Sequence, residues 1–171
     1  MKKLLTVVFV VAFATFTNNA FAQKFAHISS SELIQLMPEL KDAQTKLEAY
    51  HKELSIQLEE LQVELNRKWD AFQKVANTLS DEAREVRTKD IQDMSKRFEQ
   101  KQQDAQADYE RKQGELFQPV FAKAQEAIKK VATQGGYIYV FDSTAQSAPI
   151  HIDEKQSVDL LPAVKKELGI N

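Results

Sequence analysis

Apolar side chains recur every three or four residues along most of this chain, from Glu39 to Gln134. In the first half of that stretch the apolar positions are Leu54, Leu58, Leu61, Leu65, Trp69, Phe72, Ala76 and Leu79. Their average step of about 3.5 residues places them on one stripe of a helix and is typical of a coiled-coil seam. The spacing therefore predicts a long helix with one apolar face.

The pattern breaks near Thr78, and Ser80 is followed by acidic residues, as at the start of a helix. After the break, the apolar stripe continues through Ile91, Met94, Phe98, Ala105, Tyr109 and Leu116. Two such helices with a short break between them predict an antiparallel hairpin with its tip near 78–81.

Folding the chain back at this tip gives an expected register. Phe98 should lie near Leu61, and Ala105 near Leu54. Gln102 interrupts the second stripe, so we expect loose packing near the middle of the hairpin. Towards the end of the second helix we predict a hinge at Gly114 and Pro119, because proline removes a backbone donor and either kinks a helix or starts a new one.

Short segments at the two ends of the chain are typical of strands. Their β-branched and aromatic composition predicts strand residues at Phe25, Ile28, Tyr137, Ile138, Tyr139, Val140 and Phe141. A third strand is expected at 149–152, and a last helix from Asp159 to Leu168; Ser31 is expected to cap the first helix. Strands this short leave edges open, so we expect pairing between subunits, with these strands as the oligomerisation surface.

The predicted fold is thus α+β and mainly α, a long helical-hairpin arm of coiled-coil type on a small β-containing body. We expect the body to comprise 23–38 and 118–171, and the arm 39–117. Residues 1–22 combine Lys2 and Lys3, an apolar run and the cleavage pattern Ala20-Phe21-Ala22, which predicts a cleaved signal peptide and an exported protein.

Charge and composition argue against two classes of function. The chain has 23 basic and 25 acidic residues, and the signal peptide would remove two lysines, leaving 21 against 25. Binding to nucleic acid is not expected, because it depends largely on basic side chains that neutralise phosphates. An enzyme is not expected either, since the chain has no cysteine and His27, His51 and His151 are widely spaced outside any metal-ligand pattern. No catalytic, cofactor or metal site is predicted.

Three apolar residues fall off the seam and are candidates for contact with a client protein: Ile56, Val63 and Val86. The other interpretation is that they are scattered surface residues or contacts with a neighbouring subunit. Trp69 and Phe72 can likewise be interpreted in two ways, as packing in the seam or as contact with a client.

The order of these features resembles the OmpH/Skp family of periplasmic chaperones. The resemblance covers nearly the whole mature chain and is carried by Lys24-Phe25-Ala26-His27-Ile28, the charged hairpin, the segment from Gln118-Pro119-Val120 to Val131-Ala132, the strand Gly136 to Asp142, and Asp159-Leu160-Leu161. It implies a periplasmic homotrimer whose arms enclose unfolded outer-membrane proteins without ATP.

This chain departs from the strongly basic members of that family because its mature form is net negative, so we predict no specific lipopolysaccharide site. The predicted function is an ATP-independent holdase for unfolded outer-membrane proteins. The alternative is a passive periplasmic coiled-coil scaffold that binds one folded partner, and its seam and strand pattern would look the same.

Overall fold

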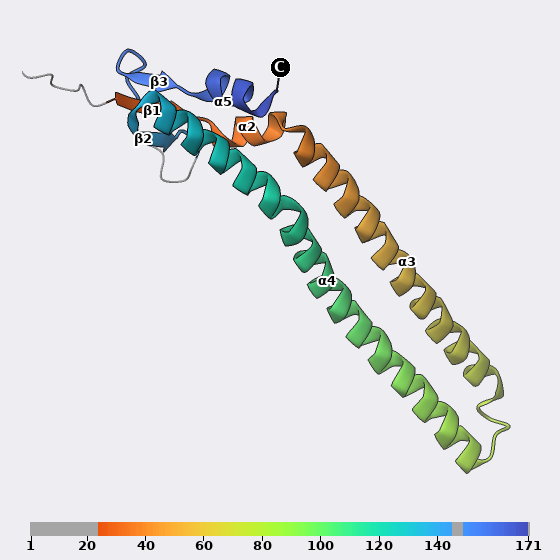
Figure 1. The fold of residues 1–171 in the computed structure, drawn as a ribbon. Coiled ribbons are helices and arrows are strands. Elements are labelled where there is room, and N and C mark those ends of the chain that lie inside the picture. The colour runs from red at the N-terminus through yellow and green to blue at the C-terminus, as the bar shows by residue number, and fades with distance from the viewer. Residues whose placement is uncertain (1–23, 145–148, 171) are drawn as a thin grey trace, which may run out of the picture. The chain divides into compact units, whose positions relative to one another are not determined.

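The computed structural model describes residues 24–144 and 149–170. The predicted signal peptide lies outside the described residues. In chain order the elements are β1 (Lys24–Ile28), α2 (Ser30–Leu36), α3 (Pro38–Val75), α4 (Asp81–Gly135), β2 (Tyr137–Asp142), β3 (Ser157–Asp159) and α5 (Leu161–Leu168) (Figure 1). The predicted fold class, mainly helical α+β with a long helical hairpin, is confirmed.

The described residues form two compact units, and each is considered by itself. One unit contains 24–30 with 127–144 and 149–169, and the other is Ser31–Glu126. Residues 31–38 and 118–126, which the sequence assigned to the body, group with the hairpin helices. We call the first unit the body and the second the hairpin.

The body is built on a parallel sheet in the order β2-β1-β3. Its central strand, β1, pairs Ala26 with Val140 on one side and with Val158 on the other. The side chains of Ala26 and Ile28 are 0% and 2% exposed. Leu160, just before α5, is 1% exposed, and Val164, within α5, is 0% exposed. These side chains form the apolar core of the body.

The third strand lies later in the chain than the sequence predicted. Residues 149–152 are not a strand; β3 is Ser157–Asp159, because a turn intervenes. In that turn the carboxylate of Asp153 accepts a hydrogen bond from the backbone N–H of Lys155 at 2.9 Å, and its carbonyl accepts one from Ser157 at 2.8 Å. Pro149 also lacks the N–H that a ladder would need.

Helix ends in the body follow from local chemistry. Gly136 and Gly169 adopt left-handed backbone with φ of 69° and 70°, directly after α4 and α5. The carboxylate of Asp159 accepts a hydrogen bond from the N–H of Leu161, the first residue of α5, at 2.9 Å. The first helix differs from expectation: α2 begins at Ser30, so Ser31 lies inside it, and α3 starts afresh at Pro38.

A single carboxylate ties the end of β2 to the end of β1. Asp142 accepts hydrogen bonds from the backbone N–H of Ser30 at 3.2 Å and from the hydroxyl of Ser30. It also accepts bonds from the N–H and hydroxyl of Thr144, at 3.0 and 2.7 Å. Burial raises the pKa of this carboxyl, but these hydrogen bonds outweigh burial and leave the pKa below its ordinary value.

Acid is therefore expected to weaken the body. A carboxyl whose pKa is lower in the folded state than in the unfolded state stabilises the fold at pH values above its unfolded pKa, which for aspartate is about 3.9. This stabilisation is lost as the pH falls from there through the lower pKa of the folded state. Asp142→Asn should lower the unfolding temperature at pH 7. At strongly acidic pH the unfolding temperatures of the variant and of wild type should lie closer together. Thermal unfolding by circular dichroism measures both. A difference in unfolding temperature between variant and wild type that stays constant from pH 7 down to pH 2 would contradict this role of the Asp142 charge.

Candidate functional site

Most of the hairpin consists of α3 and of α4 as far as Glu126, lying side by side and antiparallel (Figure 1). Near the tip, the ammonium of Lys68 pairs with the carboxylate of Asp90 at 2.8 Å. Farther along, the rings of His51 and Tyr109 meet edge to face with centroids 5.4 Å apart. Glu39 and Lys123 form a third contact, whose hydrogen bond lowers the pKa of the Glu39 carboxyl.

The seam side chains are buried to very different degrees. Leu54, Ile91 and Met94 are 6%, 9% and 7% exposed. The half-buried seam residues are Leu58, Leu61, Leu65, Phe72, Leu79 and Phe98. Trp69 is the exception at 48% exposed, with its ring 6.2 Å from that of Phe72. Trp69 therefore presents an aromatic surface beside the seam instead of filling it.

The middle of the hairpin contains a groove of about 340 Å³ between the two helices. Leu54 and Ala105 both line it, which confirms the predicted pairing of these two positions. Gln102 and Gln106 complete the wall from α4 where larger apolar side chains would close the seam. The seam is thus open at a place where the sequence predicted loose packing.

The candidate client-contacting residues of α3 point away from α4. Ile56 is 47% exposed and Val63 is 59% exposed. Each lies two residues after a seam position, Leu54 or Leu61, and at about 100° per residue this is nearly the opposite side of the helix. Ile56 and Val63 therefore share one stripe on the outer face of α3.

The third candidate, Val86, lies on a different surface. It is 67% exposed and, at about 100° per residue, lies about 140° around α4 from the buried seam residue Ile91 and about 80° from Met94, so it lies on a flank of the helix outside the seam. Because Val86 belongs to α4 and the Ile56–Val63 stripe faces away from α4, Val86 does not extend that stripe. Any contact made by all three residues would need two surfaces.

A shallow groove on α3, which the sequence did not indicate, extends the stripe towards the tip. Its lining residues are Val63, Asn66, Arg67, Asp70, Ala71, Lys74 and Val75. Val75 is 41% exposed, so the lining of the groove combines exposed apolar side chains with charged ones. Asp70 and Lys74 follow Ile56 and Val63 on the same side of α3, so the helical spacing alone could have predicted this groove.

The predicted hinge residues sit inside an unbroken helix. α4 runs through both Gly114 and Pro119, so no new helix starts at Pro119. Proline removes one hydrogen bond, but Val120 and Ala124 just after it are 5% and 2% exposed, and their burial supports the helix. A side chain at Gly114 would meet nothing within 4 Å, so packing does not require a glycine there. The hinge stays a prediction.

The strands proposed for oligomerisation present an aromatic face. The rings of Phe25, Tyr139 and Phe141 stack with centroids 6.2 to 6.5 Å apart. Tyr139 and Phe141 are 62% and 41% exposed, and Ile138 is 51% exposed. Val140 and Tyr137 are half-buried, whereas Ile28 belongs to the core of its own chain. The aromatic stack and, apart from it, Ile138 are thus the parts of these strands open to a partner.

Two of the three histidines make a packing or hydrogen-bond contact, and the third is exposed. His27 Nδ1 lies 2.9 Å from the hydroxyl oxygen of Ser157, His51 meets Tyr109, and His151 is exposed. Across 24–144 and 149–170, no three His, Asp or Glu side chains gather in a way that could hold a metal ion. Within the same described ranges, no helix is both long and apolar enough to cross a membrane.

Fold and surfaces together define a mainly helical α+β protein with a two-helix hairpin and exposed apolar side chains on both of its units. Residues 24–168 match the model of the outer membrane protein (OmpH-like) family, and the chain belongs to this family.

Relatives of known name agree with this assignment. The chain is 28% identical over 124 residues to the chaperone protein Skp of Pectobacterium atrosepticum, covering 72% of this chain and 75% of the relative. It is 28% identical over 146 residues to the chaperone protein Skp of Photorhabdus laumondii, covering 85% and 88%. A solved OmpH-like structure from Caulobacter crescentus matches with a TM-score of 0.70 at 17% identity, covering 85% of this chain and 83% of that one, which supports the fold.

Proposed function

We propose that this protein is an ATP-independent holdase chaperone of the periplasm that keeps unfolded outer-membrane proteins from aggregating. The observation that carries the proposal is the pair of half-exposed aliphatic side chains, Ile56 and Val63, on the outer face of a helix whose seam faces the other helix of the hairpin. The names of the relatives, chaperone protein Skp, support the same class of function.

Unfolded outer-membrane barrel proteins fit such a surface. Their strands carry an apolar residue at every second position and aggregate in water when unpaired. Several weakly apolar arms around one client hold it through many small contacts, without a tight site and without nucleotide. Release requires only a destination that binds the client better.

We further propose that the protein works as a homotrimer assembled through its body. The stack of Phe25, Tyr139 and Phe141 supports association, and so does the outer edge of β2, which pairs with no further strand among the described residues. Three hairpins on one assembled body would surround a client, whereas a single hairpin offers only one side.

Native mass measured by size exclusion with light scattering tests the proposal. The mature protein is measured alone and then mixed with an outer-membrane barrel protein freshly diluted from urea. We expect a trimer that takes up one soluble client chain and ignores the same client once it is folded. An oligomer that leaves the client to aggregate would overturn the holdase and favour the scaffold that binds one folded partner.

A further inference from the structure

The tip of the hairpin ends helix α3 without the usual glycine. Helices often end in a glycine with left-handed backbone, whose neighbouring N–H groups satisfy the last carbonyls. Among the described residues only Gly136 and Gly169 have positive φ, so residues 76–80 lack this arrangement. Ala76, which follows α3, keeps helical backbone with φ −53° and ψ −37°. The carbonyl of Val75, the last residue of α3, accepts hydrogen bonds from the N–H and the hydroxyl of Thr78, at 2.9 and 2.8 Å. The carbonyls that follow it in the turn need donors from elsewhere.

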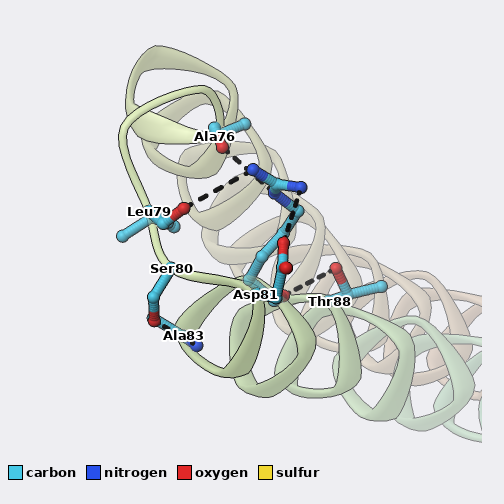
Figure 2. A network of polar contacts seen from close by, with 7 residues as sticks. Ala76, Leu79, Ser80, Asp81, Ala83 and Thr88 are labelled. Carbon is cyan, nitrogen blue, oxygen red and sulfur yellow. Dashed lines mark hydrogen bonds and ion pairs between the residues drawn. The ribbon is translucent and has the colours of Figure 1, made fainter.

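Arg84, in the first turns of α4, supplies donors to the carbonyls of the C-cap residue Ala76 and of Leu79 in the turn. Its Nε donates to the carbonyl of Ala76 at 3.1 Å, and Nη2 reaches the carbonyl of Leu79 at 3.5 Å. Nη1 contacts the carboxylate of Asp81 at 3.4 Å. Figure 2 shows the carbonyls of Ala76 and Leu79 and the Asp81 carboxylate directed at the same guanidinium.

The start of α4 is fixed independently of this side chain. The hydroxyl of Ser80 accepts the N–H of Ala83 at 3.3 Å, and the carbonyl of Ser80 accepts the N–H of Arg84 at 2.9 Å (Figure 2). Hydrogen bonds from its own backbone N–H and from Ser80 lower the pKa of the Glu82 carboxyl. A firm first turn of α4 therefore holds Arg84 in place to reach back to α3.

We propose that Arg84 caps α3 in place of a glycine and thereby controls the opening of the hairpin tip. The guanidinium suits this task because it is planar, offers several donors in fixed directions and is always charged. Its positive charge also lies at the carbonyl end of α3, where a cation is favourable.

The expected extent of opening follows from the next polar contact between the helices. That contact is the ion pair of Lys68 with Asp90, two turns back from the end of α3. Between it and the turn lies the half-buried apolar side chain of Phe72, and Leu79 in the turn is half-buried as well. Without Arg84, fraying of the tip should stop at this ion pair.

The test is hydrogen exchange by mass spectrometry on the full-length mature protein carrying Arg84→Met. We expect amides of 73–84 to exchange on the order of fivefold faster, the effect of losing one or two net hydrogen bonds, while amides before 68 and after 90 keep their rates. Arg87→Met is the matched control, because it removes the same charge from a side chain without a hydrogen bond or ion pair to any described residue. Equal exchange in the two variants would overturn the proposal.

A second variant separates capping from simple charge. Arg84→Lys keeps the cation at the end of α3 but cannot place two donors in the arginine geometry. We expect its exchange at 73–84 to stay close to that of Arg84→Met. Exchange at the wild-type rate would show that charge alone stabilises the tip, and would overturn the capping role.

Discussion

Replacing Ile56 and Val63 together by aspartate should weaken the retention of an unfolded barrel protein by roughly tenfold or more. Each substitution removes an aliphatic side chain whose burial against a client is favourable by about 1.5–3 kcal/mol, and it adds a charge that the client would have to desolvate. Both side chains are about half exposed and lie opposite the seam, so the hairpin should remain intact. Light scattering of the diluted client at increasing chaperone concentration measures the effect.

The matched control places the same two charges on another exposed face of α3, as Ser55→Asp with Gln73→Asp. Both positions are exposed and polar, so this variant should hold the client nearly as well as wild type. The native mass of both variants should equal that of wild type. Unchanged holding by the Ile56 and Val63 variant would remove the outer stripe of α3 from the client surface. Equal loss in the control would reduce the effect to general repulsion by negative charge.

The second large effect is expected in the body, where two isoleucines of one sheet differ in burial. Ile28 is 2% exposed and Ile138 is 51% exposed. Ile28→Ala should lower the free energy of unfolding by about 2–5 kcal/mol, because it leaves a cavity in the core. Ile138→Ala should cost less than about 1 kcal/mol within one chain. Urea unfolding followed by circular dichroism compares the two variants.

Protein concentration adds information to this comparison. If Ile138 packs against another subunit, the loss in Ile138→Ala should depend on protein concentration, because association stabilises the folded chain by mass action. The loss in Ile28→Ala should appear at every concentration. If the two substitutions lowered the free energy of unfolding equally at all protein concentrations, the distinction between Ile28 in the core of one chain and Ile138 on an exposed face would be contradicted.

The hairpin was predictable because its signal is periodic and long. The apolar spacing gave both helices, and Ser80 indicated where the second one starts, close to the observed start at Asp81. Pairing two phased stripes about a known tip also gives the register, which is why Leu54 and Ala105 were placed together correctly. A repeated pattern averages out the weak preference of any single residue.

The features that the sequence missed depend on contacts between distant residues. β3 is only three residues long and is defined by its pairing with β1, more than 100 positions earlier, rather than by its own pattern. The capping by Arg84 depends on which side chain reaches back over the turn. To see that Val86 and Ile56 lie on different surfaces, one must compare the direction of each residue with the seam of its own helix, in both helices together. Each seam could be read from the sequence, but the sequence analysis did not make this comparison.

The parallel pairing of β1 with β2 and β3 also constrains the order in which the chain folds. β1 stands first among the described residues, while both of its partners lie beyond residue 136. During synthesis the first strand therefore cannot pair until more than 100 further residues have emerged. The hairpin lies entirely within that interval, and its closure brings the ends together, which lowers the entropic cost of joining them. The helices should thus form first, and the sheet should be the last part of the molecule to become ordered.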